Sequence, residues 1–180
     1  MYKVYIKGYV GNLGTKVLIE ERHDELLNYF DASYLDKVLS DINGGAHPPL
    51  FIGDENAAIE VIDREAIGKG GVLASLWKIC DRNKCGVRYN LLAMPILQGT
   101  IEICNYFDLN PYRLLTDNSE ILFVNCRASE PMILVGETTS DKKRIRVDND
   151  MESYLTKDFK DEIDKIIPNY TKNYEKRSNS

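Results

Sequence analysis

The strongest constraint on the fold is a cluster of three glycines within four residues, at positions 68, 70 and 71. Apolar residues follow at the spacing of one helix face: Leu73, Leu76, Trp77 and Cys80. Glycine accepts a positive φ and allows close approach of backbones, so the cluster predicts a tight turn at the N-terminus of a helix. A short apolar run, Ala57–Ile62, precedes it and is expected to end in a buried segment.

This turn is a candidate anion site. The first N–H groups of a helix have no partner within the helix and attract anions, and a lysine adds positive charge. We therefore predict a phosphate- or carboxylate-binding site at Gly68, Lys69, Gly70 and Gly71. A turn that binds nothing has the same composition, and the spacing is neither a Walker A loop nor a GxGxxG fingerprint.

The composition indicates a soluble globular protein. The 180 residues are 43% hydrophobic and 28% charged, enough for one domain with a substantial core. A net charge of −5 argues against a nucleic-acid or membrane partner. No apolar run approaches the roughly 18 residues that span a bilayer. The N-terminus alternates rather than resembling a signal peptide, so we expect a cytoplasmic protein.

The cysteines and histidines do not form a metal-binding pattern. They are Cys80, Cys85, Cys104 and Cys126, with His23 and His47. The Cys80–Cys85 spacing is not typical of zinc sites and neither histidine is near it in sequence, so we predict no metal site. In a reducing compartment such thiols are expected to be buried or half-buried and free.

Period-2 and period-3.6 patterns alternate along the chain. Strands are expected at Tyr2–Gly8, Cys85–Tyr89, Glu120–Asn125, Met132–Glu137 and about Arg144–Val147. Helices are expected from Thr15 towards Phe30, from Asp31 or Ser33 to Ile42, after the glycine turn, at Leu97–Phe107 and over Leu155–Ile167. On the fourth helix, the expected apolar side is Leu97, Ile101, Cys104 and Phe107. The interleaving predicts an α/β (α+β) domain with a mixed sheet.

One segment resembles a linker. Residues Asn43–Pro49 are rich in glycine and proline and must end the preceding helix. We therefore expect an N-terminal strand–helix segment at 1–49, packed on a main domain at 50–168. The alternative is that residues 43–49 simply form a long loop. The polar residues 169–180 are expected to form a flexible tail.

A series of short motifs resembles a known family over residues 66–139. In order they are Gly70–Cys80, Gly86–Val87, Pro95–Ile96, Glu102–Leu115, Ser119–Leu122 and Val135–Thr138. The series is similar to the C-terminal domain of the aminoimidazole ribonucleotide synthetase superfamily, especially its hydrogenase-maturation (carbamoyl dehydratase) branch. This resemblance implies a three-layer α/β/α fold. It also implies a glycine turn that closes over a phosphate-bearing ligand, and ATP-dependent phosphorylation of an amide or carbonyl oxygen.

The resemblance also implies a second ligand-facing loop, formed by Thr116, Asp117, Asn118 and Ser119. The alternative is that this polar tetrapeptide only forms a turn before the strand at 120–124.

The chain departs from the family pattern at the turn. Where the family commonly has an aspartate, a threonine and an acidic residue, this sequence has Ala66, Gly68 and Lys69. Replacing a carboxylate and a hydroxyl group by a cation makes the turn suited to bind an anion and less suited to bind a metal ion. The family's N-terminal domain, which supplies carboxylates for ATP and magnesium and forms the dimer, has no room before Tyr2. There is no room either for the family's extra helix between Asn125 and Met132, and the terminal cysteine of the maturation enzyme is missing.

Three functions remain open. We favour a non-catalytic phosphate- or nucleotide-binding or regulatory module over the C-terminal half of a split ATP-dependent enzyme. A self-associating scaffold is the third. No cofactor is expected with certainty, and ATP and magnesium would bind only if an ancestral site or a partner completes the site. The expected partner is a second copy of the chain or a separate protein similar to the N-terminal domain.

Overall fold

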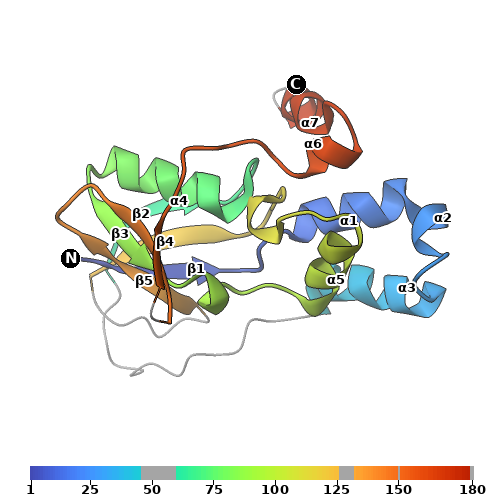
Figure 1. Cartoon of the computed structure of the whole chain (residues 1–180), viewed down its shortest axis with the longest axis horizontal. Coiled ribbons are helices and arrows are strands. Elements are labelled where there is room, and N and C mark those ends of the chain that lie inside the picture. The colour runs from blue at the N-terminus through green and yellow to red at the C-terminus, as the bar shows by residue number, and fades with distance from the viewer. Residues whose placement is uncertain (46–59, 126–131, 150, 179–180) are drawn as a thin grey trace.

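The computed structural model describes residues 1–45, 60–125, 132–149 and 151–178 (Figure 1). Its strands form one seven-stranded sheet in the order β2-β4-β1-β5-β3-β6-β7. They are β1 (Lys3–Lys7), β2 (Val61–Ala66), β3 (Gly86–Tyr89), β4 (Glu120–Val124), β5 (Ile133–Thr139), β6 (Arg144–Asp148) and β7 (Met151–Tyr154). Within the sheet β3 and β6 pair in parallel and the other neighbours are antiparallel. The expected α/β class with a mixed sheet is therefore confirmed.

Strand β1 is an inner strand of the sheet and lies between β4 and β5. Side chains of a strand alternate between its faces, so Val4 and Ile6 point to one face and Tyr5 to the other. Val4 and Ile6 belong to the main core, whereas Tyr5 packs with Leu122 and other residues on the opposite face. The N-terminal strand thus contributes buried side chains to both faces of the sheet.

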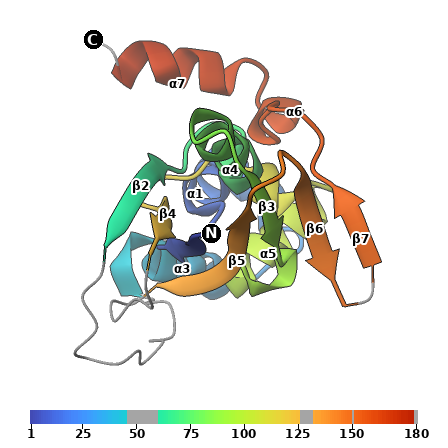
Figure 2. The same ribbon diagram turned by 90° about the vertical axis from the view of Figure 1, so that its left-hand side faces the viewer.

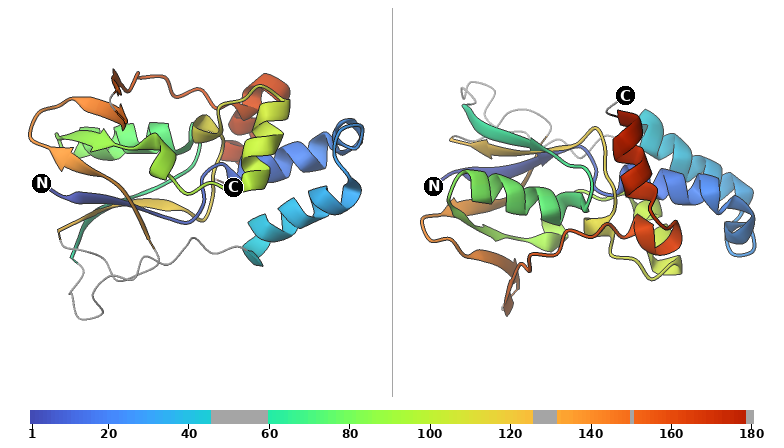
Figure 3. Two further views of the ribbon diagram at one scale, coloured as in Figure 1. Left: turned by 60° about the horizontal axis from the view of Figure 1, so that its bottom comes forward. Right: turned by 90° about the horizontal axis from the view of Figure 1, so that it is seen from above.

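The helices form two groups. They are α1 (Asn12–Glu21), α2 (His23–Leu26), α3 (Ala32–Ser40), α4 (Gly71–Arg82), α5 (Gln98–Tyr106), α6 (Ile163–Ile166) and α7 (Tyr170–Ser178). Helix α4 lies along one face of the sheet, while α1, α3 and α5 lie beyond the ends of the strands (Figure 3). Each group has its own apolar core, one under α4 and one among α1, α3 and α5. The helix predicted after the glycine turn is α4, and its Leu76 and Cys80 are buried as expected.

The expected helix over Leu155–Ile167 is wrong. Only Ile163–Ile166 is helical, and the extended segment before it begins with a hydrogen bond from Leu155 N to Arg144 O of 2.9 Å. Aspartates in this segment accept bonds from backbone N–H groups, which competes with helix formation. The residues from 170 to 178, expected as part of a tail, form helix α7, and α6 and α7 lie on the same side of the sheet as α4 (Figure 2).

Three further expectations need correction. Helix α1 begins at Asn12 instead of Thr15, because Gly11 adopts the left-handed conformation (φ 75°) and turns the chain early. The buried side of α5 is formed by Thr100, Ile103 and Cys104, so the expected apolar side was rotated around the helix. Strands β2 and β7 were not anticipated, because β2 carries charges and β7 is exposed throughout.

Several expectations lie outside the described residues: the boundary at 49/50, Cys126, His47 and the segment between Asn125 and Met132. None of the helices that the structure describes is both long and apolar enough to cross a membrane.

Candidate functional site

The predicted turn connects β2 to α4 and uses its glycines for close backbone contact. Gly70 caps α4 with φ 77°, and Gly71 follows with φ 66°. A Cβ at Gly71 would lie 2.5 Å from the carbonyl oxygen of Tyr112, and one at Gly70 would lie 2.9 Å from that of Phe159. Side chains do not fit at either position. The glycines therefore let two distant segments, at 112–113 and 159–161, pack directly on the turn.

Asp161 places a carboxylate at this turn. Its Oδ2 accepts from Gly70 N (2.7 Å), and its Oδ1 accepts from Leu115 N (3.1 Å) and Ile163 N (3.0 Å). The residue is 2% exposed, and this burial raises the pKa of the carboxyl to about 6, although the three N–H donors act in the opposite direction. The N–H group of Gly70 at this turn is therefore already bonded to a carboxyl group of the chain itself.

A pocket of about 710 Å³ opens beside the turn. Its lining contains four lysines, three aspartates and one aromatic ring: Lys69, Lys157, Asp158, Phe159, Lys160, Asp161, Asp164 and Lys165. Of the four predicted turn residues, Lys69 is the one that lines it. We call it the lysine pocket.

The lysines of the lysine pocket differ in whether they form an ion pair. Lys69 pairs with Glu175 of α7 at 3.2 Å, and Lys165 pairs with Glu162 at 2.6 Å. Within the described part of the chain, the side chains of Lys157 and Lys160 take part in no hydrogen bond or ion pair, although Lys160 is close enough to Asp158 to lower the pKa of that carboxyl. Cationic groups that form no ion pair therefore gather at this pocket.

The aspartates of the pocket are already bonded. Asp158 Oδ2 accepts from Arg113 at 2.6 Å, and Asp164 accepts from the backbone and hydroxyl of Thr171. Across the described ranges, no group of three or more His, Cys, Asp or Glu residues could hold a metal ion. The donors around the turn fit a magnesium ion poorly and phosphate oxygens well, because lysines outnumber uncommitted carboxylates.

The second predicted loop lies beside the turn, and its side chains bond to neighbouring segments. Thr116 Oγ1 accepts from Gly11 N (2.8 Å) and donates to Leu114 O (3.0 Å). Ser119 Oγ donates to Tyr9 O at 2.9 Å, while Ser119 O accepts from Ile67 N at 2.9 Å. These bonds connect the loop to the turn before α1 and to the turn before α4.

The other two loop residues complete this arrangement. Asn12 exchanges two bonds with the backbone of Asp117, at 2.9 and 3.0 Å. Asn118 is exposed and has φ 50°. None of the four loop residues lines the lysine pocket, although Asn118 and Ser119 line a smaller pocket of about 280 Å³ that reaches Ile67.

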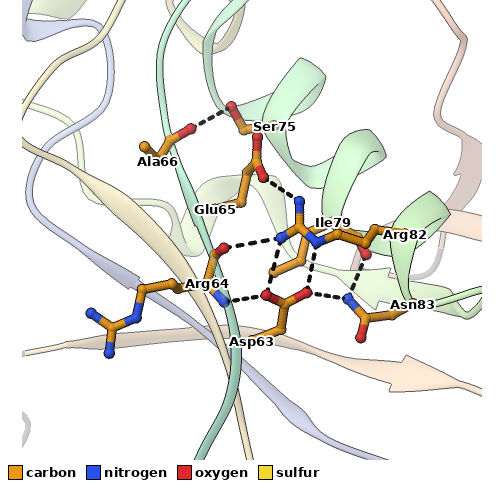
Figure 4. Close-up of polar contacts among 8 residues, drawn as sticks. All are labelled: Asp63, Arg64, Glu65, Ala66, Ser75, Ile79, Arg82 and Asn83. Carbon is orange, nitrogen blue, oxygen red and sulfur yellow. Dashed lines mark hydrogen bonds and ion pairs between the residues drawn. The ribbon is translucent and has the colours of Figure 1, made fainter.

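An ion-pair network fixes the far ends of the elements that carry the turn (Figure 4). Arg82, at the end of α4, donates to both carboxylate oxygens of Asp63 and to Glu65 on β2, at 2.7–3.1 Å. Asn83 Nδ2 also donates to Asp63, at 2.6 Å. Strand and helix are thereby held together along their length, which keeps the turn between them in place.

Sequence reasoning missed Asp161, Lys157, Lys160 and Lys165, because their segment was predicted as a helix. Alternating lysine and aspartate around Phe159 was the available signal, since this pattern does not suit a helix with one apolar side.

Comparison with known proteins shows a shared fold. No family profile and no curated sequence matches the chain. Among solved structures, Escherichia coli HypE, a hydrogenase maturation protein, aligns with a TM-score of 0.61 and 13% identity over 88% of this chain and 51% of its own. A HypE solved in complex with ATP gives 0.59 and 14% over 86% and 50%. Thiamine-monophosphate kinase from Stenotrophomonas maltophilia K279a gives 0.53 and 17% over 82% and 50%. This chain spans about half the length of these proteins and shares the fold of that half.

The turn provides a first test. Gly71→Ala should destabilise the protein by roughly 2–4 kcal/mol, because the alanine requires a strained φ and collides with Tyr112. Gly68→Ala is the matched control: nothing lies within 4 Å of its added Cβ, so its effect should stay within about 0.5 kcal/mol. Urea denaturation measures both. Equal stability of the two variants would contradict this account of the turn.

Asp161 provides a second test, in the pH dependence of stability. Its pKa in the folded protein is about 6, above its ordinary value. Ionising Asp161 therefore costs more free energy in the folded state, and its contribution to stability falls as the pH rises through about 4 to 6. Asp161→Asn is neutral at every pH. The unfolding free energy of the wild type minus that of the variant should therefore rise by roughly 1–3 kcal/mol between pH 7.5 and pH 4.5. A free-energy difference that stays constant, or that falls as the pH is lowered, would refute the raised pKa of Asp161.

Proposed function

We propose that this protein binds a phosphate-bearing small molecule in the lysine pocket, as a binding or regulatory module without catalysis of its own. The observation that supports this most is the gathering of Lys69, Lys157, Lys160 and Lys165 at a pocket beside the N-terminus of α4. Its volume of about 710 Å³ suits a ligand of nucleotide size.

Binding would use the side chains rather than the turn's amides. Lys157 and Lys160, whose side chains make no hydrogen bond or ion pair within the described residues, would contact phosphate oxygens first. Lys69 would share its charge between Glu175 and the ligand. The partial positive charge at the start of α4 adds to the attraction. Phe159, half-buried against Trp77 with ring centroids 6.0 Å apart, offers an aromatic edge to a base.

The HypE structure solved with ATP supports a nucleotide as the ligand, since it shares the fold of this chain. The same comparison favours a second candidate function, the C-terminal half of an ATP-dependent enzyme, because this chain spans about half of those proteins. In that case a protein similar to the other half would supply the metal-binding carboxylates. A self-associating scaffold and a cytoplasmic location remain predictions.

A thermal-shift titration with inorganic phosphate, AMP, ADP and ATP, each with and without magnesium, tests the proposal. A ligand at 100 times its Kd stabilises by about 2.7 kcal/mol and should raise Tm by a few degrees. We expect a shift with the nucleotides that does not depend on magnesium. Lys160→Glu should weaken binding by at least about tenfold, because it replaces an attractive charge by a repulsive one. Lys69→Glu should act in the same direction.

Lys78→Glu is the matched control, since Lys78 is an exposed lysine of α4 that does not line the pocket. It should bind as the wild type does. A shift that requires magnesium would favour the enzyme instead. Absence of any shift, or full binding by Lys160→Glu, would overturn the proposed site.

A further inference from the structure

Helices α2 and α3 lie at the opposite end of the molecule from the sheet (Figure 1). Aromatic rings of residues in or next to α2, α3 and α5 form a cluster. Tyr29 contacts Phe30 and Tyr106 with ring centroids 5.1 and 5.3 Å apart, and Phe30 contacts Tyr106 at 6.0 Å. Although its ring belongs to this cluster, Tyr29 is 74% exposed. An exposed aromatic cluster on a protein surface indicates an interaction site.

These rings line a pocket together with polar groups of α5. The pocket has a volume of about 470 Å³ and is lined by Tyr29, Phe30, Glu102, Asn105 and Tyr106. Glu102, Asn105 and Tyr106 stand at i, i+3 and i+4, so they share one face of the helix. The pocket is therefore lined by three aromatic rings together with a carboxylate and an amide.

Two hydrogen bonds favour the ionised form of the Glu102 carboxylate. It accepts from the hydroxyl of Tyr34 and, at 2.8 Å, from Gln98 Nε2. These two bonds hold the pKa of Glu102 below its ordinary value. A carboxylate thus lines the same pocket as the rings of Tyr29, Phe30 and Tyr106.

The chain segment that contains Tyr29 and Phe30 is also rich in carboxylates. Between residues 20 and 36 there are six carboxylates and one arginine. They are Glu20, Glu21, Asp24, Glu25, Asp31 and Asp36, with Arg22. The guanidinium of Arg22 donates to Ile166 O at 2.8 Å. Such a segment attracts cations over about 10 Å at moderate salt.

We propose that this aromatic–acidic pocket docks a basic segment of a protein partner and holds one of its arginine side chains. A guanidinium is planar, so it can stack on Tyr29 or Tyr106 while it donates to Glu102. Asn105, exposed at the rim, can accept a further hydrogen bond. The charge of the site excludes an acidic partner. The two pockets therefore differ in the ligand that they attract: this site attracts a cation, and the lysine pocket attracts an anion.

The test uses the full chain and a capped tetra-arginine peptide, with a tetra-citrulline peptide as its neutral isostere. Two-dimensional NMR titration should shift the amides around Tyr29, Glu102 and Asn105 with the arginine peptide and leave them unchanged with citrulline. Tyr29→Ala should raise the Kd about fivefold, through loss of the cation–π contact. Glu102→Gln should raise it about threefold.

Two controls keep the result interpretable. Tyr154→Ala removes another exposed tyrosine (68% exposed), on β7, and should leave the Kd unchanged. Tyr29→Phe retains the ring and should retain binding, which separates loss of the contact from loss of the fold. Equal binding of both peptides, an unchanged Kd for Tyr29→Ala, or shifts confined to other acidic surfaces such as Asp63 and Glu65 would overturn the proposal.

Discussion

The hydrogen bond from Gly70 N to the carboxylate of Asp161 is the interaction on which the site depends. One buried side chain connects the turn before α4, the segment at Leu115 and the start of α6. Those segments are far apart in sequence, so bonds between residues that are close in sequence cannot connect them as this carboxylate does. It also satisfies N–H groups that would otherwise be buried without partners, which costs roughly 1–3 kcal/mol for each group.

That bond also determines where the lysine pocket lies. It brings Lys157 and Lys160 next to Lys69, although Lys69 is far from both of them in the sequence. Asp161 accepts bonds from N–H groups, and Asp158 is paired with Arg113. The charged groups that a ligand would contact in this pocket are therefore mainly the ammonium groups of the lysines. The pocket therefore suits phosphate, whereas the aromatic–acidic pocket at the far end suits a cation.

Local sequence predicted the turn and the helix α4 because both depend on short-range properties: the conformational freedom of glycine and an apolar residue every three or four positions. The central strands were predicted for the same reason. Asp161 was missed because its partner Gly70 lies 91 residues away, and nothing near Asp161 indicates that bond. The buried side of α5 was misjudged because Thr100 is buried through a hydrogen bond with Thr15, a contact between distant segments. The ligand-facing role expected for Thr116–Ser119 remains a prediction. In the structure, the side chains of Thr116 and Ser119 bond to neighbouring segments of the chain.

Amide NMR mapping with inorganic phosphate tests the central claim most directly, because it locates a site without assuming a particular nucleotide. We predict saturable shifts at Lys69, Phe159 and Lys160, with little change near Asp63 and Arg82 at the other end of α4. Shifts that do not saturate, or that concentrate away from the lysine pocket, would contradict the proposal that this pocket binds phosphate.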